Sequence, residues 1–157
     1  MKNKLVVILG PTASGKTSLA VKLAYHTKSE IISADSRQIY KGMDIGTGKD
    51  LSEYTINDQR VPYHLVDILD PQKDYSVYKF KKDFFNCFNQ LNKKNKNVIL
   101  CGGTGLYIES VLLNYDIPNI GPNIELRNKL SKLTQKQLIE QLNKIDAAQF
   151  KPTYHTT

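Results

Sequence analysis

The stretch Gly10-Pro11-Thr12-Ala13-Ser14-Gly15-Lys16-Thr17 decides the fold, because it has the pattern of a phosphate-binding loop (Walker A) in the required context. An apolar run over 5–9 precedes it and predicts a buried strand, and a helix-like run over 18–24 follows it. The glycines let the backbone fold tightly, so that its N–H groups converge on an anion at the positive end of the following helix. The sequence therefore predicts a phosphorylated ligand, but not what is done to it.

Two side chains at the end of the loop add specific chemistry. Lys16 is placed to reach terminal phosphate oxygens, and Thr17 to place its hydroxyl on Mg²⁺, the cofactor that we expect. The structural alternative is a turn that ends in Lys-Thr by chance, and the strand–turn–helix context argues against it. The predicted phosphate site is the whole loop: Gly10, Pro11, Thr12, Ala13, Ser14, Gly15, Lys16 and Thr17.

The composition narrows the class of protein. A length of 157 residues suits one domain, or one domain and a fragment of another. The net charge of +7 favours an anionic partner, either nucleic acid or a small ligand. Cys87 and Cys101 lie in apolar runs, which favours buried free thiols in a reducing cytosol. Since no apolar stretch is long enough to cross a bilayer and no signal peptide is visible, we expect a cytoplasmic protein without a membrane partner.

The order of segments predicts an α/β fold, a P-loop NTPase-like three-layer domain with a parallel sheet. We expect strands near 4–9, 30–34, 63–68 and 97–101, and helices over 16–27 and 77–91. The character of the sequence changes near the stretch 118–122, which contains two prolines and a glycine. Helical patterns follow over 124–133 and 138–145. The predicted domains are therefore an α/β core over 1–118 and a partial helical domain over 119–157.

Asp35 is the best-placed carboxylate, because it follows the second predicted strand and should emerge beside the phosphate loop. It could act as a general base or as a metal ligand, and the structural alternative is a helix N-cap. Asp67 lies in an apolar run and could serve as the acid that hydrolytic phosphate-loop enzymes carry, or could be a hydrogen-bonded structural acid.

A second glycine-rich turn, 102–105, follows the fourth predicted strand. Its Thr104 could donate to a phosphate oxygen or simply cap the next helix. Gln38 could bind an amide or base edge, and Tyr40 and Tyr107 could stack on a base, although packing is the simpler role for aromatic residues. The stretch 46–49 imitates a phosphate loop but has no strand before it, so we expect a surface loop near the site.

The histidines offer no metal cluster. His64 lies in the third predicted strand and is expected to be a structural histidine with a hydrogen-bond partner. No histidine lies in a cluster of ligand residues, so we predict no zinc site.

Five stretches in this order resemble the tRNA dimethylallyltransferase family. They are Gly-Pro-Thr-Ala-Ser-Gly-Lys-Thr at 10–17, Ser-Ala-Asp-Ser-Arg-Gln-Ile-Tyr at 33–40, Gly-Met-Asp-Ile-Gly-Thr-Gly-Lys at 42–49, Tyr-His-Leu-Val-Asp at 63–67 and Gly-Gly-Thr-Gly-Leu-Tyr at 102–107. The resemblance covers residues 1–118 and extends less clearly into the helical remainder. One departure is Gly48-Lys49-Asp50, where many relatives have Ala-Lys-Pro.

The resemblance implies an activity and its partners. Family members transfer the five-carbon group of dimethylallyl diphosphate to the exocyclic amine of the adenosine 3′ of the anticodon in tRNA. The implied catalytic residues are Asp35, as proton acceptor, and Thr104, on the reacting group or the diphosphate. The implied partners are the anticodon stem–loop and dimethylallyl diphosphate, with Mg²⁺, and a monomer at full length. The implied tRNA-binding residues are Asp35, Ser36, Arg37, Gln38 and Thr104.

The family also implies a longer chain. Its members continue through a helical insertion and return to the core, with an arginine that grips the diphosphate, so this chain resembles a truncated copy that stops inside the insertion. A small-molecule kinase, an isopentenyltransferase for free adenine nucleotides and an inactive phosphate-binding fragment remain as alternatives. The charge of +7 favours tRNA over a free nucleotide.

Overall fold

The computed structural model describes residues 4–146. The chain divides into two compact units, Met1–Pro118 and Asn119–Thr157. Among the described residues, no helix combines the length and the apolar character needed to cross a bilayer.

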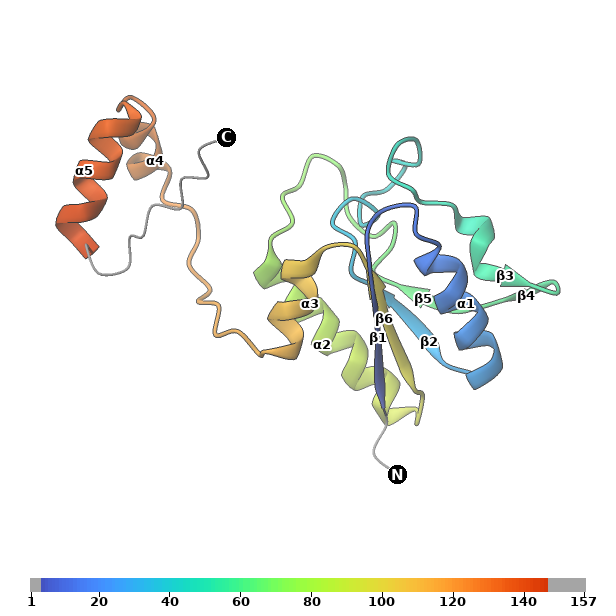
Figure 1. Ribbon diagram of the computed structural model, residues 1–157. Coiled ribbons are helices and arrows are strands. Elements are labelled where there is room, and N and C mark those ends of the chain that lie inside the picture. Colours follow the sequence, from blue (N-terminus) through green and yellow to red (C-terminus); the bar gives the residue numbers. More distant parts are fainter. Residues whose placement is uncertain (1–3, 147–157) are drawn as a thin grey trace. The chain divides into compact units, whose positions relative to one another are not determined.

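A four-stranded parallel sheet forms the middle of the first unit (Figure 1). Its order is β1 (Leu5–Leu9), β6 (Val98–Gly102), β2 (Glu30–Ser33) and β5 (Tyr63–His64). All neighbouring strands are parallel, with Leu5 opposite Val98 and Ile31 opposite Ile99. The predicted α/β class is confirmed, and parallel strands bring their carboxyl ends to one edge, where ligands bind in such sheets.

Helices cover both faces of this sheet. Alternate residues of β6 point to opposite faces, as in any strand. Val98 and Leu100 join a core with α2 (Val77–Lys93) and α3 (Gly105–Leu112), where Phe80 and Phe84 are fully buried. Ile99 and Cys101 join a second core against α1 (Lys16–Thr27), as Figure 1 shows from the sides on which the helices lie.

The predicted third strand is much shorter than expected. We expected a strand over 63–68, but β5 ends at His64, and Leu65 and Asp67 both have a φ of 59°. The N–H groups of Asp67 and Ile68 instead donate to the carbonyls of Gln38 and Ile39. Leu65 and Val66 are buried whereas Ile68 is exposed, and burial alone does not require an extended strand.

A hairpin follows the 42–49 loop, in a segment for which we predicted neither a helix nor a strand. A short 3₁₀ helix (Leu51–Tyr54) leads into β3 (Thr55–Ile56) and β4 (Gln59–Arg60), which pair antiparallel. The two turn residues, Asn57 and Asp58, have φ values of 49° and 59°. Asn and Asp tolerate this left-handed conformation better than other residues, so this dipeptide was a usable hairpin signal.

Gly102 lies where two strands of the sheet approach too closely for a larger side chain. A Cβ on this residue would lie 2.3 Å from the carbonyl oxygen of Ala34. That oxygen accepts a hydrogen bond from the N–H of Thr104 at 3.1 Å, and the N–H of Ala34 donates to Cys101 O at 2.7 Å. The close approach therefore lies where β2 and β6 end together.

We expect Gly102→Ala to lower the free energy of unfolding by about 1–3 kcal/mol, the usual cost of forcing atoms into a filled space. Urea unfolding of the purified chain measures this change. Gly103→Ala is the matched control, because its Cβ would meet only Gly10 O, at an ordinary 3.6 Å. Equal stabilities of the two variants would contradict the close approach.

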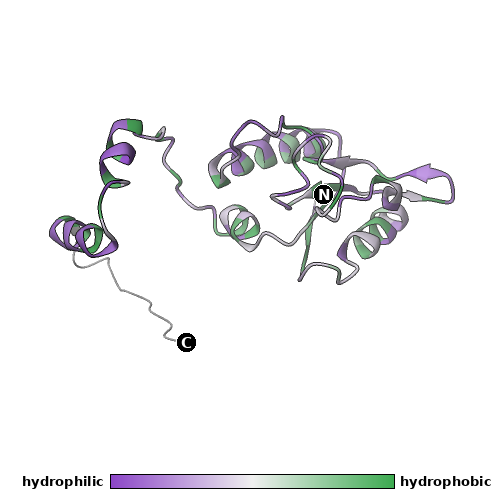
Figure 2. Ribbon diagram, turned by 90° about the horizontal axis from the view of Figure 1, so that it is seen from above, coloured by the Kyte–Doolittle hydropathy of each residue, from purple (hydrophilic) through white to green (hydrophobic). Residues whose placement is uncertain are grey.

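The second unit contains two helices in its described part, α4 (Ile124–Leu130) and α5 (Gln135–Asp146). The side chain of Asn123 caps α4 by accepting from Leu126 N at 2.9 Å. None of the residues of α4 is buried, and large apolar side chains such as Ile124 and Ile145 are exposed. Figure 2 shows hydrophobic residues among the hydrophilic ones along these helices.

Candidate functional site

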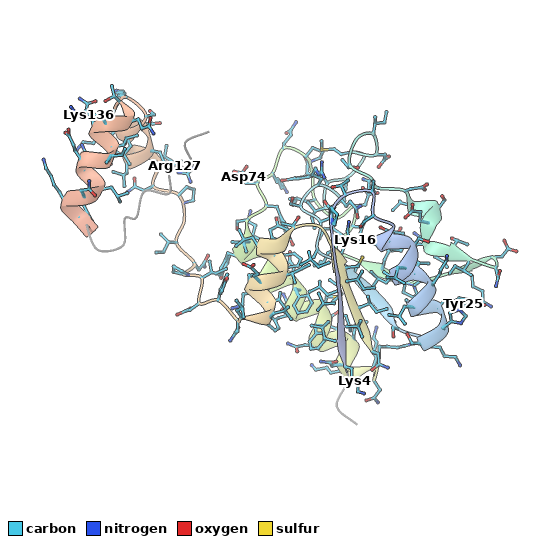
Figure 3. The ribbon with its side chains drawn as sticks, viewed as in Figure 1. Lys4, Lys16, Tyr25, Asp74, Arg127 and Lys136 are labelled. Carbon is cyan, nitrogen blue, oxygen red and sulfur yellow. The ribbon has the colours of Figure 1, made fainter. Side chains whose placement is uncertain are left out.

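A cavity of about 230 Å³ lies at the carboxyl ends of the sheet strands, where the sequence predicted a ligand site. Ser33 and Gly102 are the last residues of β2 and β6, and both line it. The phosphate loop and the start of α1 form another wall, at the position of Lys16 in Figure 3. The lining residues are Thr12, Ala13, Ser14, Gly15, Lys16, Thr17, Ser33, Asp35, Gln38, Thr47, Gly48, Glu53, Tyr54, Cys101 and Gly102.

The phosphate loop has the tight backbone that its glycines predicted. Gly15 has a φ of 75° and precedes the first residue of α1, and Ala13 has a φ of 60°. Ser14 Oγ donates to the carbonyl of Pro11 at 2.8 Å, and the Lys16 ammonium donates to the same oxygen. Of the eight predicted residues, Thr12 to Thr17 line the cavity, whereas Gly10 and Pro11 do not.

Asp35 lines the same cavity as the loop. Its Oδ1 accepts from Arg37 N at 2.9 Å, which makes a turn after β2 rather than the N-cap of a helix. One oxygen thus fixes the orientation of the carboxylate, which leaves Oδ2 available for a ligand.

Thr104 occupies the N-cap position of α3, but its hydroxyl makes no cap hydrogen bond to that helix. Its Oγ1 instead accepts from Ser36 N at 3.0 Å and lies 3.3 Å from Ser36 Oγ. Neither Thr104 nor Ser36 lines the cavity. The geometry therefore joins Thr104 to the segment that carries Asp35, and this contact is neither of the two roles that the sequence offered.

Gln38 lines the cavity, and its side-chain amide contacts two other segments. Its Nε2 donates to the carbonyl of Gly48 at 3.1 Å, and its Oε1 lies 3.4 Å from Ser33 Oγ. Thr47 and Gly48 also line the cavity, so the loop over 42–49 forms part of its wall. It is less of a surface loop than expected, because Thr47 and Lys49 are buried.

Lys49 holds this loop in place. Its side chain is 1% exposed, and its Nζ lies 2.5 Å from Asp67 Oδ1, 2.7 Å from Asp44 Oδ1 and 2.9 Å from the Tyr40 carbonyl. Burial alone would lower the pKa of Lys49, but the hydrogen bonds to the two carboxylates raise it. The hydrogen bond from Lys49 lowers the pKa of Asp67. Asp67 does not line the cavity, so of its two predicted roles the structural one fits.

We expect Lys49→Met to lower the free energy of unfolding by about 2 kcal/mol at neutral pH. A fully buried pair would cost more, but Asp44 and Asp67 remain partly exposed. The difference from the unaltered chain should shrink as pH falls through the lowered pKa of Asp67, because the protonated acid no longer attracts Lys49. Urea titrations at several pH values measure both effects, with exposed Lys73→Met as the control. A loss of stability in both variants alike would contradict the role of Lys49.

The remaining sequence candidates are structural. His64 Nε2 lies 2.8 Å from Glu30 Oε2, which confirms the expected hydrogen-bond partner. Tyr107 is buried and stacks on Phe80 with ring centroids 4.3 Å apart. Tyr40 packs against the same core, so neither tyrosine is placed to stack on a base.

Sequence reasoning missed several cavity residues, above all Glu53 and Tyr54. Both come from the 3₁₀ helix that follows the 42–49 loop, and only a short cap at Asp50 marks that helix in the sequence. Glu53 is a second carboxylate beside Asp35. Burial raises the pKa of Tyr54 and raises that of Cys101 to about 11, so both stay neutral at pH 7.

The cavity offers oxygen ligands suited to Mg²⁺, which takes one or two protein oxygens and completes its shell with phosphate and water. Thr17, which carries a hydroxyl, and Asp35, which carries a carboxylate, both line it. In the described part of the chain, no group of three or more His, Cys, Asp or Glu side chains is arranged to hold a metal ion.

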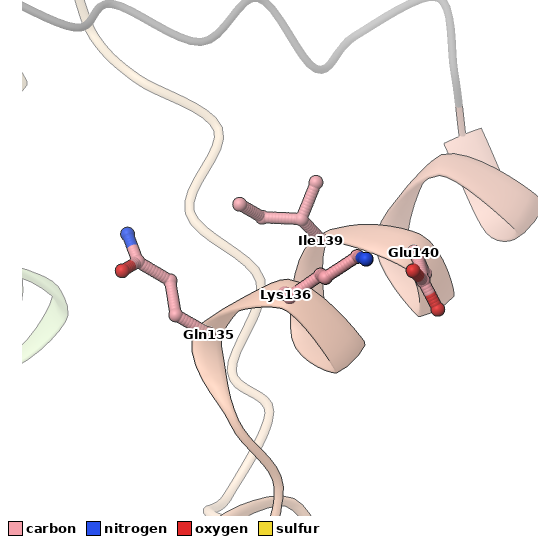
Figure 4. A pocket seen from close by; sticks show the side chains of 4 residues that line it. All are labelled: Gln135, Lys136, Ile139 and Glu140. Atoms are coloured by element: carbon pink, nitrogen blue, oxygen red, sulfur yellow. The ribbon is translucent and has the colours of Figure 1, made fainter.

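A further hollow, with a volume of about 410 Å³, lies on α5 (Figure 4). Its lining residues are Gln135, Lys136, Ile139 and Glu140, all from the first turns of that helix. None of them was a candidate from the sequence, and none belongs to the predicted phosphate, catalytic or tRNA-binding residues.

Comparisons with known proteins show the family to which the chain belongs. Residues 38–156 match the family model described as IPP transferase. The chain belongs to the IPP transferase family. A tRNA dimethylallyltransferase of Phocaeicola vulgatus is 51% identical over 142 residues, or 90% of this chain and 46% of the relative. One from Syntrophus aciditrophicus is 50% identical over all of this chain and 50% of its own. The chain thus spans about half the length of the curated relatives it matches.

Solved structures of IPP transferases have the same fold. The tRNA isopentenylpyrophosphate transferase of Bacillus halodurans is 37% identical, with a TM-score of 0.69 over 94% of this chain and 49% of that one. A eukaryotic dimethylallyltransferase, solved acting on tRNA, is 27% identical, with a TM-score of 0.76 over 92% of this chain and 36% of that one.

Proposed function

We propose that this chain carries the catalytic core of a tRNA dimethylallyltransferase. The enzyme would transfer the dimethylallyl group from dimethylallyl diphosphate to the exocyclic amine of the adenosine 3′ of the anticodon. The observation that carries the proposal is the single cavity in which the phosphate loop, Asp35 and Gln38 meet. The family and the names of its relatives supply the reaction class.

The phosphate loop would hold the diphosphate of the donor. The backbone N–H groups of 12–17 and the Lys16 ammonium would stabilise the negative charge that grows on the leaving oxygens. Thr17, with Asp35 nearby, would hold Mg²⁺, which supplies further neutralisation of that charge when bound. Because the loop precedes α1, the helix dipole acts in the same direction.

Asp35 would act as the proton acceptor. The amine nitrogen of the adenine forms a bond to the first carbon of the dimethylallyl group, the bond from that carbon to the diphosphate oxygen breaks, and the proton passes from the nitrogen to the carboxylate. The adenosine must leave the anticodon-loop stack to reach the cavity. Ser36 and Gln38 would contact the tRNA, and Thr104 would fix Ser36 and hence the segment that carries Asp35.

The rest of the chain would serve tRNA binding. We propose that residues 1–118 form the core and that 119–157 begin a helical insertion domain that contacts the anticodon stem–loop. The six basic residues of 119–157 outnumber its three acidic ones, which suits an RNA partner. The full-length protein would act as a monomer in the cytoplasm, where its tRNA is found.

A transfer assay tests this function. The chain is assayed alone and joined to the part of the Syntrophus aciditrophicus relative that lies outside the match, with labelled dimethylallyl diphosphate and either unmodified tRNA or free AMP. We expect transfer to tRNA by the joined protein. Transfer to AMP alone would favour a free-nucleotide enzyme, and ATP turnover without prenyl transfer would favour a kinase.

A further inference from the structure

The hydroxyl of Tyr54 is a polar group of the cavity wall that no described residue satisfies. Tyr54 lines the cavity together with the phosphate loop, and only 4% of the residue is exposed. Its hydroxyl makes no hydrogen bond to any described residue, whereas every fully buried side-chain nitrogen or oxygen atom among those residues has a partner. The Tyr54 oxygen is therefore not sealed in the core, and the space that the residue lines is the cavity.

The ring that carries this hydroxyl is packed on several sides. Tyr54 belongs to the core cluster that joins α1 to β6, together with Val21 and Ile99. Its ring centroid lies 4.2 Å from that of Tyr63, and its carbonyl accepts from Val61 N at 2.7 Å. The ring cannot carry its hydroxyl to a different partner without losing these contacts, so the hydrogen-bond partner must come to the hydroxyl.

The neighbours of the hydroxyl lie on the cavity side. Burial raises the pKa of this phenol most, and the charges of Cys101, Glu53 and Asp35 raise it further. All three of these residues line the cavity. The phenol is therefore protonated at pH 7 and offers an O–H donor. Neither carboxylate accepts from it in the structure, so the donor remains available to a bound molecule.

A neutral O–H donor at this place suits the oxygens of an anion. Of the described residues that line the cavity, Lys16 alone is cationic. A diphosphate carries several negative charges, so neutral N–H and O–H groups must supply much of its binding, and hydrogen bonds to charged oxygens are the stronger class. We infer that the Tyr54 hydroxyl donates a hydrogen bond to the diphosphate group of the prenyl donor. The inference rests on the proposed function, since it adds a residue to the same site.

Calorimetric titration of the 157-residue chain with inorganic pyrophosphate and Mg²⁺ tests this role. We expect Tyr54→Phe, which keeps the ring and removes the hydroxyl, to weaken pyrophosphate binding by about tenfold, the lower end of what a hydrogen bond to a charged group contributes. Tyr63→Phe is the matched control. Its ring contacts that of Tyr54, but its hydroxyl accepts from Arg60 and the residue does not line the cavity, so pyrophosphate binding should stay unchanged.

Thermal unfolding monitored by circular dichroism separates ligand binding from a structural role. We expect Tyr54→Phe to unfold at the same temperature as the unaltered chain, because its hydroxyl has no partner among the described residues to lose. A lower unfolding temperature together with weaker pyrophosphate binding would make the hydroxyl a structural group and overturn the inference.

Parallel titrations with AMP and with an unmodified anticodon stem–loop RNA separate the diphosphate from the nucleotide substrate. We expect Tyr54→Phe to bind both as the unaltered chain does. Equal pyrophosphate affinities in Tyr54→Phe and Tyr63→Phe, or a loss confined to AMP or RNA, would overturn the inference while the proposed function stands. If the unaltered chain bound no pyrophosphate, the proposed function would be wrong and the inference with it.

Discussion

We expect Asp35→Asn to lower the single-turnover rate of dimethylallyl transfer by about 10²–10⁴-fold, which is the usual contribution of a positioned general base. The asparagine keeps the oxygen that accepts from Arg37 N, so the turn that follows β2 is retained. It removes the proton acceptor, and it adds no charge near the phosphate loop, so pyrophosphate affinity should stay the same. The measurement is rapid-quench transfer by the joined protein described above, together with calorimetry of pyrophosphate.

Glu53→Gln is the comparison that this experiment needs, because Glu53 is the other carboxylate in the cavity. A rate loss in Glu53→Gln alone would move the base from Asp35 to Glu53. If Asp35 is chiefly a metal ligand, Asp35→Asn should weaken Mg²⁺-dependent pyrophosphate binding along with the rate, and excess Mg²⁺ should restore part of both. Unchanged transfer in Asp35→Asn would exclude either role.

Lys16→Ala should weaken pyrophosphate binding by about 100-fold while the chain remains folded. The charge-assisted hydrogen bond that is lost contributes about 1.5–3 kcal/mol in typical sites, and the larger value applies where the ammonium works with converging backbone N–H groups. The variant should fold normally, because Lys16 lines the cavity at the surface and is absent from both core clusters. Calorimetry measures the affinity, and thermal unfolding monitored by circular dichroism measures the stability.

Lys22→Ala controls for the general loss of positive charge, since Lys22 is an exposed residue of the same helix. It should bind pyrophosphate like the unaltered chain. Equal binding by Lys16→Ala and Lys22→Ala would mean that the loop does not hold the diphosphate through Lys16. A loss in Lys16→Ala that accompanies unfolding would instead make Lys16 a structural residue.

Local signals predicted the fold and the loop, because each depends on residues close in sequence. The apolar run, the glycines and the helix-forming run of 5–24 specify strand, turn and α1 without reference to the rest of the chain. Asp35 was found for a topological reason, since a residue that follows a parallel strand emerges at the ligand edge. The bounds of α1, Lys16–Thr27, agree with the predicted 16–27, because they too depend on residues close in sequence.

Long-range contacts could not be predicted in this way. Lys49 pairs with Asp67 across 18 residues, and nothing in either neighbourhood marks the other as its partner. The apolar run after His64 has the composition of a strand, but left-handed residues at Leu65 and Asp67 turn it toward Gln38. Glu53 and Tyr54 line the cavity from the 3₁₀ helix that follows the 42–49 loop, and the long-range contact of Lys49 with Asp67 holds that loop.

The hydrogen bond from Ser36 N to Thr104 Oγ1 spans 68 residues, and this separation affects the order of events in folding. Contacts between distant residues form late, because the entropy of closing a long loop must be overcome first. During synthesis, the phosphate loop and Asp35 leave the ribosome well before β6 and Thr104. A nascent chain that ends before Val98 would therefore carry every residue of the phosphate loop and still lack β6, the strand that pairs with β1, so we expect it to bind ligand only after β6 has been added.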